Sequence, residues 1–115
     1  MHRLKYFIRL NGDEPVREWL CELEKHNRAQ YHRIATKIDK LEIEGFKLLA
    51  TQMMTRLKGK DDLYELRGGQ CRVIVYYDER SSEFVLLHGF LKKRRTETRE
   101  IEEGSRLLQE YLLKE

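Results

Sequence analysis

The chain contains only one proline and two cysteines among its 115 residues, and no apolar run approaches the length of a membrane span. Cys21 and Cys71 have no CxxC spacing and no nearby histidine pair, so we expect free, buried thiols rather than a disulfide or a metal site. The N-terminus is too charged for a signal peptide. These absences predict a cytoplasmic protein with no membrane segment, no metal and no other cofactor.

An excess of charge of one sign is also absent. Lys and Arg total 23 and Asp and Glu total 20, so the formal net charge is only +3. This balance excludes an indiscriminate polycation for nucleic acid, and the placement of the cations therefore matters more than their sum. With 37% charged and 40% hydrophobic residues and no linker, the sequence predicts a single folded domain over residues 1–115.

Familiar catalytic motifs are missing as well. The sequence has no paired catalytic carboxylates, no Ser-His-Asp arrangement, no Walker loop and no HExxH motif. Its histidines, His2, His26, His32 and His88, are scattered without metal-ligand spacing. Chemistry must therefore come from the charged side chains that the sequence does bring together.

Cations gather at the end of the last expected strand. The apolar run over residues 84–91 leads directly into Lys92, Lys93, Arg94 and Arg95. Consecutive like charges repel one another unless an anion or solvent offsets them. This strand end is therefore predicted to bind an anion.

A glycine-rich turn brings two further cations to the same sheet. Gly68 and Gly69 permit the positive φ that a short hairpin turn requires. If the hairpin forms, Arg67 and Arg72 face each other near its tip. Only a phosphate, a carboxylate or bulk water can accommodate two guanidinium groups there.

Rings are interleaved with these cations. Tyr64, His88 and Phe90 lie in the same expected strands. Cations bind phosphates and flat rings stack on splayed bases, which is the combination that single-stranded RNA binding requires. We therefore expect these three residues, together with Arg94 and Arg95, to contact RNA.

Each candidate also has a structural interpretation. Arg67 and Arg72 can cover their strand face with their apolar stems. His88 can be a half-buried, hydrogen-bonded imidazole. Lys92 and Lys93 can simply blunt the end of a strand.

The hydrophobic periodicity predicts an α+β domain with the element order β-α-α-β-β-β-α. A first helix starts near Asp13, a second runs from Asn27 to Gly45, and a final helix is capped by Thr96 or Thr98. Short connections require the later strands to pair antiparallel. The expected strands cover residues 4–9, 55–58 with 62–67, 71–77 and 84–91.

The element order and several motifs resemble the RelE/ParE superfamily of bacterial toxins, specifically the phage-derived, HigB-like branch of type II toxin–antitoxin systems. The resemblance spans nearly the whole chain. Its motifs are Pro15-Val16, the segment from Leu57 to Gly59, residues 63–67, Arg72-Val73 and residues 86–93. It implies a RelE-like fold with an N-terminal strand, a helical hairpin, a three-stranded antiparallel run completing a small mixed sheet, and a C-terminal helix.

The resemblance implies a ribosome-dependent mRNA endoribonuclease, an mRNA interferase, that works without a metal by 2′-hydroxyl attack on the adjacent phosphodiester. Arg67 and Arg72 are expected to clamp the scissile phosphate. Crowding by other cations favours a neutral amine, so Lys92 or Lys93 is expected to act as base or acid. The two lysines point to opposite strand faces, and Lys93 is slightly favoured because the family's cationic site lies beneath the final helix.

The resemblance also implies partners, namely the ribosome, mRNA and a helix-turn-helix antitoxin encoded beside the toxin. A cationic active site must be neutralised in the resting cell, so acidic antitoxin residues are expected to cover it. Two alternatives on the same fold stay open. One is a ParE-like toxin that inhibits gyrase, and the other is a catalytically inactive RNA-binding regulator.

Overall fold

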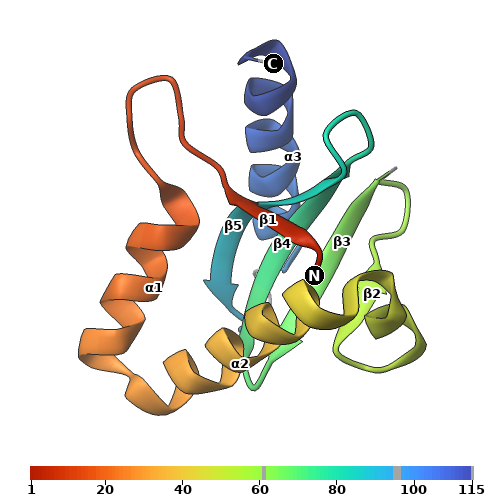
Figure 1. Cartoon of the computed structure of the whole chain (residues 1–115). Coiled ribbons are helices and arrows are strands. Elements are labelled where there is room, and N and C mark those ends of the chain that lie inside the picture. The colour runs from red at the N-terminus through yellow and green to blue at the C-terminus, as the bar shows by residue number, and fades with distance from the viewer. Residues whose placement is uncertain (61, 95–96, 115) are drawn as a thin grey trace.

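The computed structural model describes residues 1–60, 62–94 and 97–114 (Figure 1). Its elements are β1 (Arg3–Tyr6), α1 (Pro15–His26), α2 (Arg28–Glu44), the 3-10 helix η1 (Gly45–Ala50), β2 (Met54–Arg56), β3 (Leu63–Gly68), β4 (Cys71–Asp78), β5 (Glu83–Leu91) and α3 (Glu97–Lys114). The strands form one five-stranded sheet in the order β1-β5-β4-β3-β2. β1 runs parallel to β5 and the other neighbours are antiparallel, which confirms the predicted α+β class with a mixed sheet.

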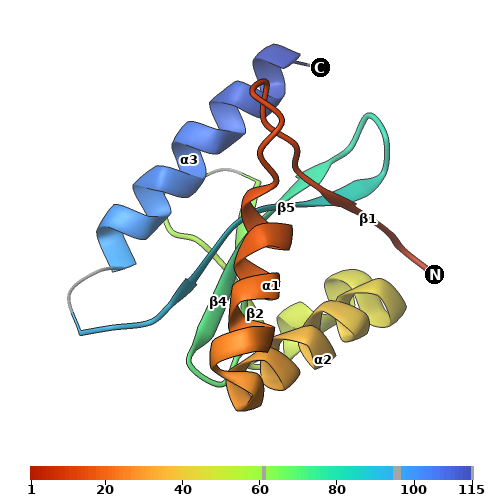
Figure 2. The same cartoon turned by 90° about the vertical axis from the view of Figure 1, so that its left-hand side faces the viewer.

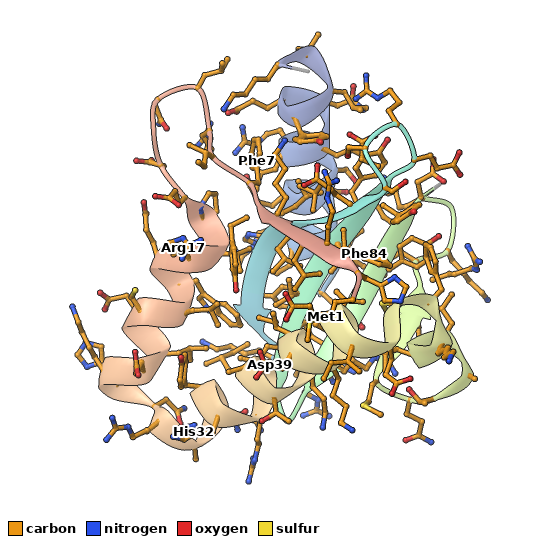
Figure 3. All side chains as sticks on the ribbon, in the orientation of Figure 1. Met1, Phe7, Arg17, His32, Asp39 and Phe84 are labelled. Atoms are coloured by element: carbon orange, nitrogen blue, oxygen red, sulfur yellow. The ribbon has the colours of Figure 1, made fainter. Side chains whose placement is uncertain are left out.

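Helices cover both faces of the sheet, with α1 and α2 on one side and α3 on the other (Figure 2). Each face has its own apolar cluster. Phe84 belongs to the cluster beneath α1 and α2, and Phe7 belongs to the cluster beneath α3 (Figure 3). The cluster beneath α3 consists of Phe7, Leu63, Ile74, Val85, Leu87, Phe90, Leu107, Leu108 and Tyr111.

The ends of α2 are as predicted. The Asn27 side chain accepts a hydrogen bond from the Gln30 backbone N–H, and Gly45 ends the helix with φ 58°. A positive φ of this size favours glycine, because a Cβ would be strained there. Sequence-local capping therefore accounts for both ends of this helix.

Other predicted boundaries are corrected. α1 begins directly after Glu14, while Asp13 pairs with Asn11 in the preceding turn. Thr98 lies inside α3 rather than at its N-terminal cap, and Thr96 lies outside the described residues. β1 covers only Arg3–Tyr6 of the expected 4–9. The strand expected over 55–58 with 62–67 is divided into two strands, β2 (Met54–Arg56) and β3 (Leu63–Gly68).

The cysteines differ from each other. Cys71 is buried as expected, and burial raises the pKa of its thiol to about 11. Cys21 is exposed on α1, so the expectation that both thiols are buried is wrong for Cys21. Residue 21 lies outside the apolar stripe that faces the sheet, which includes Val16 and Leu23.

A bulge in β5 decides which of its residues face α3. The register between β4 and β5 shifts so that Leu87 is the extra residue. Regular alternation along β5 would place Leu86 on the face of His88 and Phe90, and the bulge prevents this. Leu86 packs beneath α1 and α2, whereas Leu87 and Phe90 pack beneath α3, because a bulge shifts the alternation of side chains by one residue.

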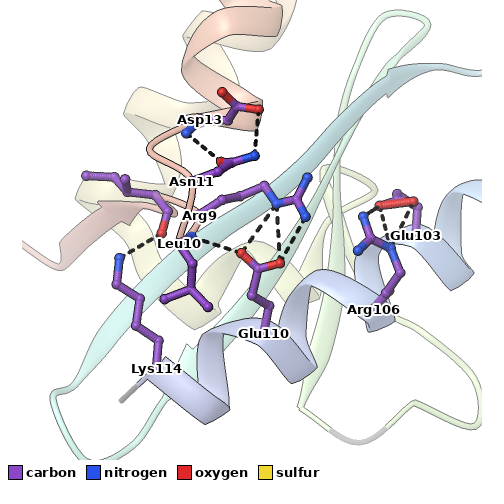
Figure 4. A network of polar contacts seen from close by, with 9 residues as sticks. Arg9, Leu10, Asn11, Asp13, Glu103, Arg106, Glu110 and Lys114 are labelled. Carbon is purple, nitrogen blue, oxygen red and sulfur yellow. Dashed lines mark hydrogen bonds and ion pairs between the residues drawn. The ribbon is translucent and has the colours of Figure 1, made fainter.

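The second half of α3 is fastened to the segment after β1 (Figure 4). Glu110 accepts hydrogen bonds from Arg9 Nη2 at 3.1 Å and from the Leu10 backbone N–H at 3.1 Å. Lys114 Nζ donates to the Ile8 carbonyl at 2.9 Å. In the described part of the chain, no helix has the length and apolarity needed to cross a membrane.

Candidate active site

The β3–β4 hairpin brings the two predicted arginines together. Arg67 and Arg72 are direct cross-strand partners, so their side chains leave the same face of the sheet. Gly69 supplies the positive φ of the turn, at 59°. Gly68 serves a different purpose, because a Cβ there would lie 2.6 Å from the Arg33 carbonyl oxygen of α2. Close packing of α2 thus fixes the hairpin tip.

A buried carboxylate lies between the arginines. Glu65 is 1% exposed, and its Oε1 accepts a hydrogen bond from Arg67 Nε at 3.1 Å and lies 3.8 Å from Arg72 Nε. Burial and the neighbouring Glu97 carboxyl of α3 raise the pKa of Glu65, and Arg67 offsets this only in part. Glu65 is not among the residues that the sequence predicts for the site, although it alternates with Arg67 on one strand and so shares its face.

The two arginines are held differently. Arg72 Nη1 donates to the backbone carbonyls of Gly69 at 2.8 Å and Cys71 at 2.9 Å, and only 12% of its side chain is exposed. Arg67 donates to Thr55 Oγ1 at 3.4 Å, and 39% of its side chain is exposed. Arg72 is therefore the fixed cation of the pair and Arg67 the accessible one.

β5 places His88 and Phe90 on the same face. Phe90 is the cross-strand partner of Arg72, and it is buried beneath α3 rather than open for base stacking. His88 stacks on Phe90 with ring centroids 5.9 Å apart. The His88 Nε2 lies 3.3 Å from Glu100 Oε2 of α3. His88 is thus half-buried and hydrogen-bonded, and it lies at the same site as the arginines.

Tyr64 does not reach this site. Because it alternates with Glu65, it points to the opposite face, where its ring packs against Phe46 at 5.4 Å between centroids. Arg56 donates a 3.1 Å hydrogen bond to its hydroxyl. The expected contact between Tyr64 and RNA is corrected to a core role, since the residue is buried beneath the other helical layer.

The cationic strand end opens into a pocket of about 530 Å³ at the start of α3. The pocket is lined by Lys92, Lys93, Arg94, Glu97 and Thr98. Arg94 is exposed there, and Arg95 lies outside the described residues. The run of cations that the sequence predicts as an anion site therefore borders a real concavity.

Lys92 is the lysine that the structure places with Arg72. Its backbone N–H donates to the Gln70 carbonyl at 2.8 Å, which continues the ladder past β5. Since Phe90 pairs with Arg72, Lys92 two residues later shares that face, and its Nζ lies 3.8 Å from Glu97 Oε2. This register favours Lys92, whereas the family resemblance slightly favours Lys93.

Acidic residues in the first turns of α3 lie over this cationic face. Glu97 pairs with Lys92, and Glu100 pairs with His88. Within residues 1–60, 62–94 and 97–114, no group of three His, Cys, Asp or Glu side chains is placed to hold a metal ion. The cations of this face can bind a phosphate, and its carboxylate, imidazole and amine groups can move protons.

Comparison with known proteins agrees with this architecture. Residues 18–109 match the family described as phage-derived protein Gp49-like (DUF891), a span that runs from α1 to α3 and contains most of the site. The chain belongs to this family. No curated protein matches this Gp49-like chain.

A solved structure is also similar to this Gp49-like protein. It is the archaeal RelE–RelB complex from Pyrococcus horikoshii OT3, with a TM-score of 0.54 and 25% sequence identity over 81% of this chain and 97% of that chain. Together, the family and the fold confirm the predicted toxin of the RelE superfamily, of a phage-derived kind.

Proposed function

We propose that this Gp49-like toxin is a ribosome-dependent mRNA endoribonuclease of a type II toxin–antitoxin system. The observation that carries the proposal is the convergence of Arg67, Arg72 and Lys92 on one sheet face, beside a pocket at the strand end. Such a face can bind the phosphate of an RNA strand and stabilise additional negative charge on it. The alternative of a gyrase inhibitor gives no reason for a phosphate clamp.

The proposed reaction is transfer of the scissile phosphodiester to the neighbouring 2′-oxygen. The 2′-oxygen bonds to phosphorus, the bond to the 5′-oxygen breaks, and the products are a cyclic phosphate and a free 5′-hydroxyl. Arg67 and Arg72 stabilise the charge that develops on the phosphate oxygens. Lys92 is the amine placed to move a proton on this face, and Lys93 and Arg94 line the pocket that would receive the flanking backbone.

We also propose that the chain assembles with a cognate antitoxin in the cytoplasm. The similar archaeal protein was solved as a RelE–RelB complex. In this branch we expect a helix-turn-helix antitoxin whose acidic residues neutralise the cationic face. Ribosome and mRNA are the remaining partners of the proposed reaction.

Purified toxin added to a translation extract tests the proposal. A defined mRNA should be cut within codons only while it is being translated, as mapped by primer extension. The Arg72→Ala variant should lose on the order of 10²-fold in cleavage rate, since it lacks one charge of the phosphate clamp. Arg28→Ala, which removes an exposed arginine at the start of α2, is the matched control and should cut like the parent.

Three results would contradict the proposal. Translation arrest with intact mRNA would exclude a nuclease. A DNA damage response without transcript loss would favour gyrase inhibition. Undiminished toxicity of Arg72→Ala would favour a regulator that binds RNA without cutting it.

A further inference from the structure

Two buried polar atoms at the site have no hydrogen-bond partner among the described residues. They are Glu65 Oε2 and Arg72 Nε. Buried polar groups nearly always have a partner, and the exceptions are often catalytic groups or groups that await a ligand. Arg72 Nε lies 3.8 Å from Glu65 Oε1, beyond the length of a hydrogen bond. The neighbouring Glu97 carboxyl offers Glu65 a donor only when one of the two carboxyls is protonated. With both carboxyls ionised, Glu65 Oε2 lacks a donor and Arg72 Nε lacks an acceptor.

The chemistry of the two atoms defines what would complete them. A carboxylate oxygen needs a donor, and the Arg72 N–H needs an acceptor. The ribose 2′-hydroxyl next to a scissile phosphate offers both within one nucleotide, as an O–H donor beside phosphate oxygen acceptors. A single RNA linkage thus satisfies both orphaned atoms.

We propose that Glu65 is the proton acceptor for the 2′-hydroxyl in the RNA cleavage reaction. The inference rests on the proposed function. Glu65 Oε2 takes the hydroxyl proton while the electron pair of the 2′-oxygen forms the bond to phosphorus. The bond from phosphorus to the 5′-oxygen breaks, and that oxygen takes a proton from a cationic donor on the same face, the Lys92 ammonium or the His88 imidazolium.

The surroundings of Glu65 suit this role. Arg67 and Arg72 favour its ionised form, and a carboxylate must be ionised to accept a proton. Burial and Glu97 act in the opposite direction and raise the pKa of Glu65, which makes its carboxylate a stronger base. With a carboxylate as the base, Lys92 or His88 is available to donate a proton instead of accepting one.

The first turn of α3 lies beside Glu65. The Glu97 carboxyl interacts with Glu65 and pairs with Lys92 at 3.8 Å. An RNA phosphate carries the same charge as this carboxylate and can replace it on Lys92. Binding of RNA would therefore uncover the base at the moment when the substrate arrives.

The Glu65→Gln variant tests the role, because glutamine keeps the shape and an acceptor oxygen for Arg67 but cannot take up the proton. Single-turnover cleavage of ribosome-bound mRNA should slow by about 10²- to 10⁴-fold. Affinity for the same complex carrying a 2′-O-methyl group at the scissile nucleotide should change little. Glu102→Gln, which makes the same charge change on the exposed side of α3, is the control and should match the parent.

The pH dependence separates a base from a residue that only positions the arginines. The cleavage rate of the parent should rise with pH as Glu65 ionises. This rising limb of the pH–rate profile should be absent in Glu65→Gln. Glu65→Asp should be slower than the parent yet keep the limb, and it serves if the glutamine variant does not fold by circular dichroism. Near-parental cleavage by Glu65→Gln, or a limb that survives in it, would overturn the proposal. A parent that leaves translated mRNA uncut would instead overturn the proposed function itself.

Discussion

Over its second half, α3 packs on the sheet through the buried Leu107, Leu108 and Tyr111. Over its first half, the partly buried Ile101 is joined by the ion pairs of Glu97 and Glu100. The first kind of contact buries apolar area and is insensitive to salt. The second consists of ion pairs that another anion can replace. The two halves of α3 therefore have different roles. The second half stabilises the fold, and the first half covers the site.

Gly104 lies between these halves. A Cβ at this position would lie 2.7 Å from the Ile74 side chain, so glycine allows α3 to approach β4 closely. Glycine also weakens a helix by about 1 kcal/mol relative to alanine. Gly104 therefore both allows close packing on β4 and weakens the helix, and it lies at the boundary between the two halves of α3.

Truncation of the apolar half should have the largest effect on stability. Leu107→Ala should lower the free energy of unfolding by about 2–5 kcal/mol, because it leaves a cavity beneath α3. Urea unfolding followed by circular dichroism measures this. Leu113→Ala is the control, since that side chain is 86% exposed and should change stability by less than about 0.5 kcal/mol. Equal effects of the two variants would show that the second half of α3 does not hold the fold.

Truncation at the cationic end should change cleavage instead of stability. Lys92→Ala should lower mRNA cleavage by about 10²-fold, since Lys92 shares the face of Arg72. Lys93→Ala should have a smaller effect, and both variants should unfold like the parent. Retention of cleavage in both, with ribosome binding intact, would remove the lysines from the mechanism. Proton transfer would then rest on Glu65 and His88, and the arginines would stabilise the charge on the phosphate.

Asp78 is a charged group that contacts the apolar second half of α3, through Tyr111. It therefore tests whether a charge can also stabilise the fold there. Burial pushes the pKa of Asp78 upward, but hydrogen bonds from the Tyr111 hydroxyl, at 2.6 Å, and from Arg80 outweigh it and hold the pKa below its usual value. A depressed pKa contributes stability that is present above the unfolded-state pKa and is lost as the pH falls through the folded-state pKa.

The Asp78→Asn variant should therefore be less stable than the parent by about 1 kcal/mol at neutral pH. That difference should shrink as the solution is acidified below the usual pKa of an aspartate. Urea unfolding at a series of pH values measures it. A difference that stays constant into acid would mean that the charge of Asp78 contributes nothing.

The smallest effect is expected from the acids that cover the site. Glu97→Gln should tighten binding of a short 2′-O-methyl RNA by about 2- to 5-fold, because the exposed ion pair with Lys92 contributes at most about 1 kcal/mol. Fluorescence anisotropy at low salt measures the affinity. Glu102→Gln gives the same change in net charge and should have less effect. If both variants tighten binding equally, overall charge alone is responsible.

Much of this fold could be predicted from local sequence. Asn27 and Gly45 mark the ends of α2 because capping depends on neighbouring residues. Arg67 and Arg72 face each other because a short glycine turn fixes the register of the hairpin. The fold class follows from the element order, since short connections allow only antiparallel pairing.

The parts of the site that the sequence does not predict depend on distant contacts. Glu65 is buried, and one of its neighbours, Glu97, comes from α3, far along the chain. Tyr64 and Phe90 resemble available stacking rings in sequence, but each is buried beneath a helical layer. The bulge at Leu87 shifts the faces of β5, and no single residue type marks it.

The polar contacts of Glu110 and Lys114 fasten the last turns of α3 to the segment after β1. The first turns of α3 are held in part by exchangeable ion pairs, those of Glu97 and Glu100. The two ends of this helix therefore differ in local stability. Local opening should therefore start at Glu97 and progress toward Gly104, and amide hydrogen exchange should be fastest in the first turns of α3 and slowest around Leu108.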